Sequence, residues 1–169
     1  MKRHIWLWSL VGFAVSSLFG TILHFLYEWL GEPSWIAPFS GINESTWEHM
    51  KLLFWPMLIF AAFQAVFFRG EKSFACIKLR GILLGITLIP ITFYTYNGVI
   101  GKSPDWINIA IFFISAAAAY IYEAKLFKKG DIKCLHPRGA ILALSVLALM
   151  FILFTFYPPA LEIFKDPLL

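Results

Sequence analysis

The sequence predicts an all-α integral membrane protein, a bundle of five transmembrane helices with its N-terminus inside and its C-terminus outside. Of its 169 residues, 60% are hydrophobic and 14% are charged, and the mean hydropathy is +0.75, which is too apolar for a soluble domain. A helix crosses the hydrocarbon core with about 20 apolar residues. The segments that meet this requirement are residues 5–28, 52–68, 79–97, 106–124 and 139–157.

The first segment follows a short basic start and is longer than the roughly 7–15 apolar residues of a signal-peptide core. No A-x-A cleavage site closes it, so we expect it to stay as the first helix. Gly12, Ser16, Gly20 and His24 recur every four residues. Residues at this spacing share one helix face, and small residues there let another helix approach closely in lipid.

The next stretch leads from an aromatic connection into the second helix. We expect Trp35 to anchor this connection at the membrane interface. Ser45, with Glu48 three residues later, fits a capping box at the helix start. If Asn43 is the cap instead, Glu44 and Glu48 become neighbours on one helix face.

The last three segments are predicted to be membrane scaffold. The third opens with a G-x-x-x-G pattern, which is typical of close helix packing, and ends with the polar aromatic sequence FYTYN at residues 93–97. The fourth ends near Glu123, whose side chain we expect to extend toward Lys125 or Lys128 at the membrane surface. The fifth is almost entirely apolar.

The charges of the short connections predict the orientation. With the N-terminus inside, eleven of the fourteen lysines and arginines lie on the inner side, as the positive-inside rule requires. We therefore expect residues 1–169 to form one multi-pass transmembrane domain. The basic excess predicts contact with anionic membrane lipids rather than with nucleic acid. The small-residue faces leave a homo-oligomer or a helix-packing partner open.

Cys76 and Cys134 both fall on the predicted cytoplasmic side. They lack the C-x-x-C spacing of zinc or redox sites, and cytoplasmic thiols are normally kept reduced. We expect two free thiols.

Polar chemistry is concentrated where the first and second helices meet the outer surface. A histidine and a glutamate one turn apart can ligate one ion together, and nitrogen and oxygen ligands suit zinc, manganese or iron. The candidate ligands of a divalent metal are His24, Glu28, Glu44, Glu48 and His49.

This cluster predicts a metal-dependent hydrolase acting on a lipid or envelope substrate, because a bound ion can acidify a water molecule. Glu48 is then a ligand or general base, with Tyr94 and Tyr96 as candidate hydrogen-bond donors. Two alternatives stay open. The cluster can be a structural network in a ligand-binding or assembly subunit, or the acidic mouth of a small carrier that attracts cations.

The segment INESTWEHMKLLFWP resembles the signature of a family of small, uncharacterised bacterial integral membrane proteins, grouped as a domain of unknown function. The resemblance extends over most of the chain. It implies a multi-helix protein of a bacterial cytoplasmic membrane, but no activity. The matching positions are Asn43, Glu44, Ser45, Trp47, Glu48, His49 and Lys51.

Overall fold

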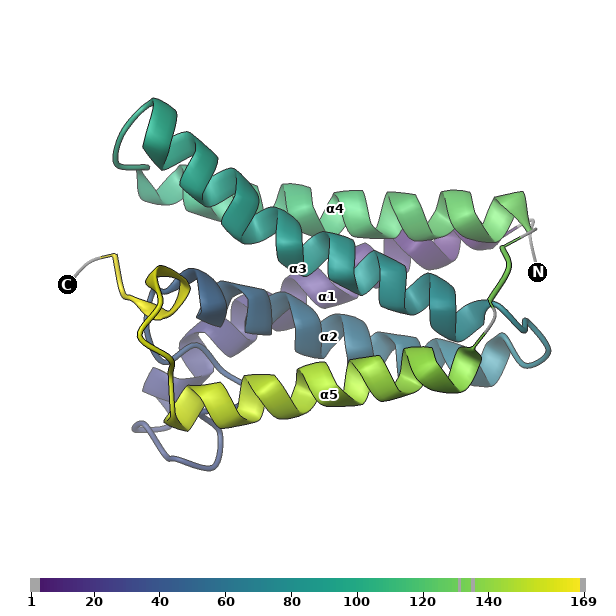
Figure 1. Ribbon diagram of the computed structural model, residues 1–169, viewed down its shortest axis with the longest axis horizontal. Coiled ribbons are helices and arrows are strands. Elements are labelled where there is room, and N and C mark those ends of the chain that lie inside the picture. Colours follow the sequence, from purple (N-terminus) through teal and green to yellow (C-terminus); the bar gives the residue numbers. More distant parts are fainter. Residues whose placement is uncertain (1–3, 131, 135, 168–169) are drawn as a thin grey trace.

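The computed structural model describes residues 4–130, 132–134 and 136–167, which form an up-and-down bundle of α-helices (Figure 1). The two chain ends lie at opposite ends of the bundle. In the described part of the chain, five helices are long and apolar enough to cross a membrane, as predicted. They are α1 (Ile5–Trp29), α2 (Thr46–Phe67), α3 (Phe74–Val99), α4 (Asp105–Lys129) and α5 (Pro137–Phe156), followed by a short 3-10 helix, η2 (Glu162–Phe164).

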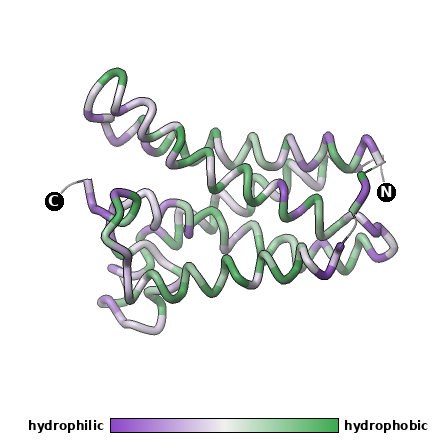
Figure 2. Tube along the Cα trace, in the orientation of Figure 1, coloured by the Kyte–Doolittle hydropathy of each residue, from purple (hydrophilic) through white to green (hydrophobic). Residues whose placement is uncertain are grey.

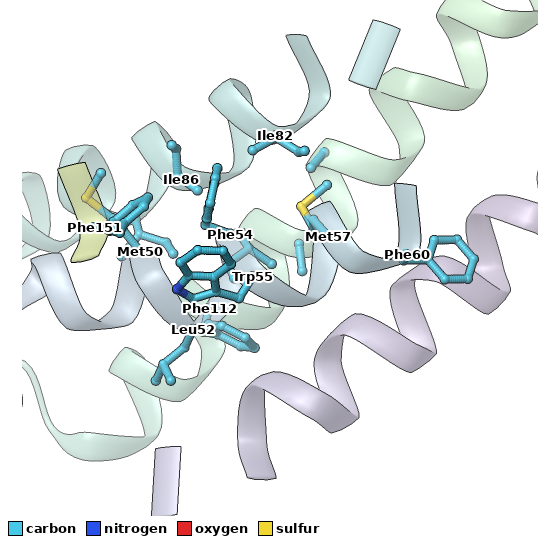
Figure 3. Packing of buried hydrophobic residues seen from close by; sticks show 14 of the residues in the cluster. Met50, Leu52, Phe54, Trp55, Met57, Phe60, Ile82, Ile86, Phe112 and Phe151 are labelled. Atoms are coloured by element: carbon cyan, nitrogen blue, oxygen red, sulfur yellow. The ribbon is translucent and has the colours of Figure 1, made fainter. Parts of the chain in front are cut away.

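Helix α2 lies at the centre of the bundle and packs against α1 and α3. Phe54 and Leu53 of this helix are completely buried, and Figure 3 shows α2 side chains meeting those of α3, α4 and α5. Apolar residues also cover much of the outer surface, while polar residues gather toward the two ends (Figure 2). A lipid environment favours an apolar exterior of this kind, with polar residues at the two ends.

The small-residue face of α1 is a packing face, as its spacing predicts. A Cβ added at Gly20 would lie 2.6 Å from the Phe112 ring and 2.9 Å from the Leu52 carbonyl oxygen. One turn away, the Ser16 hydroxyl hydrogen-bonds the buried Tyr120 hydroxyl at 2.6 Å. Helix α1 can therefore approach α2 and α4 closely only because its side chains are small.

Glu123 does not extend toward Lys125 or Lys128, so that prediction is wrong. Its side chain is buried, and its Oε2 atom lies 2.6 Å from the Lys78 ammonium of α3. Gly81 makes this geometry possible, because any Cβ at that position would collide with the Glu123 side chain. The Lys78 ammonium also lies 5.5 Å from the centre of the Tyr120 ring, within range of a cation–π interaction.

Cys76 and Cys134 are joined by a disulfide bond, which corrects the expectation of two free thiols. Cys76 lies in the first turn of α3, and Cys134 lies in the connection between α4 and α5. Both segments are at the same end of the bundle (Figure 1), and the two Cα atoms are 5.8 Å apart, a usual separation for a disulfide.

Candidate metal centre

The start of α2 is organised by its capping residues. The Ser45 side chain accepts a hydrogen bond from the Glu48 backbone amide, while the Asn43 side chain accepts one from the Ser45 amide. Ser45 is therefore the cap, and Asn43 forms a short turn before it. This arrangement leaves Glu44 outside the helix and places His49 in its second turn.

Glu44 lies between two histidines from different helices. One carboxylate oxygen is 3.5 Å from His24 Nε2 in α1, and the other is 3.6 Å from His49 Nε2 in α2. One ligand atom from each of the three residues lies within 4.8 Å of the others. Ligand atoms around a tetrahedral zinc ion with bonds of 2.0–2.1 Å are about 3.3 Å apart. The two contacts of Glu44 are close to that spacing.

The His49 ring is oriented by a backbone contact. Its Nδ1 atom lies 2.9 Å from the Ser45 carbonyl oxygen, and since a carbonyl can only accept, this nitrogen carries the proton. In the neutral ring, Nε2 then presents a lone pair toward the Glu44 carboxylate. Two facing acceptor atoms require a cation between them, and either a proton or a metal ion meets that need.

The charge of Glu44 also favours a cation at this position. The neighbouring His24 imidazole, as a hydrogen-bond partner, lowers the pKa of the Glu44 carboxyl below its usual value, although partial burial opposes this effect. The carboxylate is therefore charged at neutral pH. The other ring nitrogen of His24, Nδ1, is buried without a hydrogen-bond partner among the described residues.

Glu48 is close in sequence to Glu44 and His49, but its side chain makes different contacts from theirs. Its Oε2 atom accepts a hydrogen bond from the Ile42 amide at 3.1 Å and lies 2.5 Å from the Lys51 ammonium. That ammonium also donates to the Ala37 carbonyl oxygen and the Thr155 hydroxyl. Glu48 is thus directed to a buried ion pair, and it is outside the three-residue group within the described chain.

The remaining predicted residues lie around the group rather than in it. Glu28 is exposed beside a second, more polar hollow that His24 and Glu44 also line. The Tyr94 hydroxyl lies 3.1 Å from the Thr46 hydroxyl, and Tyr96 is half-buried farther along α3. The structure therefore brings together three of the five predicted ligands.

The three-residue group opens onto a cavity of about 460 Å³ between α1, α2, α3 and α4. Asp105 and Asn108 of α4 line this cavity too, and sequence reasoning did not select them as site residues. Their only signal in the sequence is their place in the first turn of a helix, at the end of the bundle where the three-residue group lies. The C-terminal tail also reaches the site, because the Glu44 amide donates to the Asp166 carboxylate at 3.3 Å.

Five apolar helices indicate a multi-pass membrane protein, here with a His–Glu–His group at the end of the bundle opposite the N-terminus. The chain belongs to the family of unknown function DUF6512, whose model matches residues 1–169. No curated protein and no solved structure matches the chain.

Proposed function

We propose that this protein binds one divalent metal ion through His24, Glu44 and His49 and uses it to hydrolyse a lipid or envelope substrate at the extracytoplasmic face of a bacterial membrane. The observation that carries the proposal is the position of Glu44, whose two carboxylate oxygens each face a histidine Nε2 atom at 3.5 and 3.6 Å. Zinc, manganese and iron all accept this combination of ligands.

Two imidazoles and one carboxylate are a ligand set that catalytic zinc sites use, with a fourth position left for water or substrate. Such an ion lowers the pKa of its bound water to about 7 and polarises a carbonyl oxygen. The cavity beside the group provides space for a substrate at that fourth position.

A hydrolytic site also needs a group that accepts a proton from the attacking water. Glu48 is engaged with Lys51, so the structure supports Asp105 better in this role. Asp105 is exposed at the start of α4 and lines the same cavity as His24 and His49. The Tyr94 hydroxyl contacts the hydroxyl of Thr46, which lines the cavity.

The test is elemental analysis of the tag-free protein in lipid nanodiscs, after incubation with zinc, manganese or iron and removal of the excess. We expect close to one equivalent of one of these metals in the parent protein and none in a folded His24→Ala, His49→Ala double variant. Glu28→Ala is the matched control and should keep the metal. A parent protein that holds no metal under any of these conditions would contradict the proposal and make the group a structural network.

A further inference from the structure

We infer, on the basis of the proposed metal centre, that the substrate is a single-chain acyl amphiphile, an ester or amide. Its carbonyl group binds beside His24, Glu44 and His49, and its chain enters the cavity sideways from the membrane between α1 and α4. Three features support this inference: the cavity is polar at one end only, it is open to lipid, and its charges favour a neutral head group.

The cavity combines a polar end with an apolar body. His24, Glu44 and His49 line its outer end, together with Asp105 and Asn108. Each helix also supplies lining residues three or four positions closer to the middle of the membrane. These inner residues are Gly20 and Thr21 of α1, Leu52 of α2, Ile89 of α3 and Phe112 of α4. The one hydroxyl among them, that of Thr21, donates to the Ser17 carbonyl oxygen of its own helix. Since a helix rises about 1.5 Å per residue, the apolar part extends roughly one turn, about 6 Å, below the histidines.

The cavity is also open toward the surrounding lipid. Three of its lining residues are themselves 37–58% exposed, namely Phe25 of α1 and Ile109 and Phe113 of α4. An apolar chain could therefore pass from the membrane into the cavity without crossing water.

Size and charge narrow the class of ligand. A cavity of 460 Å³ is within the usual range for a small-molecule site. The ion's charge of about +2 is at least balanced by nearby carboxylates. Glu44 and Asp105 line the cavity, and Asp166 accepts a hydrogen bond from the Glu44 amide. A site without excess positive charge favours a neutral carbonyl head over an anionic one.

The reaction would be a simple hydrolysis. The oxygen of a water molecule forms a bond to the acyl carbon, and Asp105 takes the proton that this water loses. The bond from the acyl carbon to the ester oxygen or amide nitrogen then breaks, and the proton passes to the leaving group. The products are a fatty acid and an alcohol or amine, with water as the only co-reactant.

The test uses cobalt-loaded protein in nanodiscs, because the visible spectrum of Co²⁺ reports any ligand that joins it. Dodecanohydroxamate and acetohydroxamate share one metal-binding head, and each is titrated separately. We expect the long-chain compound to bind at least tenfold more tightly to the parent protein.

Two variants fill the cavity, and each has a matched control on the same helix. Ile109→Trp and Thr21→Trp replace lining residues, whereas Ile114→Trp and Leu18→Trp replace exposed residues that do not line the cavity. Partitioning of the hydroxamate's acyl chain into the nanodisc lipid is the same for all four variants. We expect the two cavity variants to lose most of the chain-length preference, the controls to keep it, and acetohydroxamate to bind all four equally.

The outcomes separate the two proposals. If no cobalt spectrum forms in the parent protein, both the proposed metal centre and this inference are wrong. If cobalt binds normally but the cavity variants keep the same chain-length preference as their controls, the proposed metal centre is retained and the proposed amphiphile substrate is wrong.

Discussion

The ammonium of Lys51 lies 2.5 Å from the carboxylate of Glu48, and the two side chains are almost completely buried. The ammonium also donates hydrogen bonds to the Ala37 carbonyl oxygen at 2.7 Å and to the Thr155 hydroxyl at 3.2 Å. One side chain of α2 therefore connects the α1–α2 loop to α5. Removing one partner leaves the other charge buried and unpaired, which is costlier than removing both.

Lys51→Met should accordingly destabilise the protein strongly, by about 3–5 kcal/mol. The Glu48→Gln, Lys51→Met double variant should regain part of that loss, because neither residue then carries a charge. Thermal unfolding in one detergent, followed by circular dichroism, would measure both variants. Lys102→Met is the control, since Lys102 is exposed. A double variant less stable than Lys51→Met would contradict this account of the pair.

Metal affinity should distinguish Glu44 from the other glutamates of the cluster. Glu44→Gln removes the carboxylate that faces both histidines and should weaken zinc binding by at least roughly 100-fold, since even outer-shell losses cost 10–100-fold. Glu28→Gln should bind zinc as the parent does, and so should the Glu48→Gln, Lys51→Met double variant, which leaves no unpaired buried charge. Competition with a chromogenic chelator gives the three affinities. Equal losses in all three variants would instead support the broader five-residue site.

Asp105→Asn tests the proton acceptor without touching a ligand. If Asp105 accepts the proton, hydrolysis of a long-chain acyl ester should slow by about 100-fold or more, while the metal content stays at one equivalent. Asn108 lines the same cavity and carries no charge, so the Asn108→Ala variant serves as the control. An unchanged rate in a metal-loaded Asp105→Asn protein would exclude Asp105 as the base.

Gly81→Ala should destabilise the bundle by about 1–3 kcal/mol, because the new methyl group has no room beside the paired Glu123 side chain. Gly98→Ala, in the same helix, is the comparison. Nothing lies within 4 Å of a Cβ at Gly98, so the higher helix propensity of alanine should leave stability equal or slightly greater. Unfolding of the two variants under identical conditions would show whether the difference exists.

The disulfide can be checked by maleimide labelling of the denatured protein. No thiol should react until a reductant is added, after which Cys76 and Cys134 should both be modified. Cys76→Ser provides the control, because it should expose one reactive thiol without reductant. Complete labelling of the unreduced parent protein would restore the sequence-based expectation of two free thiols.

The sequence predicted the five helices well, because hydropathy directly reflects the environment in which each helix is stable. It was less successful with polar residues, which a hydropathy profile places outside the membrane span. The capping box predicted from Ser45 and Glu48 is confirmed, since α2 begins at Thr46. The predicted membrane span began only at residue 52, however, and so left out Glu48 and Lys51, which form a buried pair. Both residues are tolerated inside because each neutralises the other, and that is a property of packing.

The candidate site shows the same limit. His24 and Glu44 could be nominated from their chemistry and their shared end of the bundle, but separating them from Glu28 and Glu48 required side-chain directions. Ser45 decides those directions, because it caps α2 and so leaves Glu44 outside the helix. Asp105 entered the site only through the packing of α4 against α1, which no local sequence signal reveals.

The buried pair of Lys78 and Glu123 also bears on how the chain enters a membrane. A lone charge inside a membrane-spanning helix is costly during insertion. Lys78 in the second turn of α3 and Glu123 in the second half of α4 both end up buried. The two helices are consecutive, and a short connection lets them pair as a hairpin. Their charges cancel once both helices have emerged, so the hairpin, rather than either helix alone, is the natural unit of insertion.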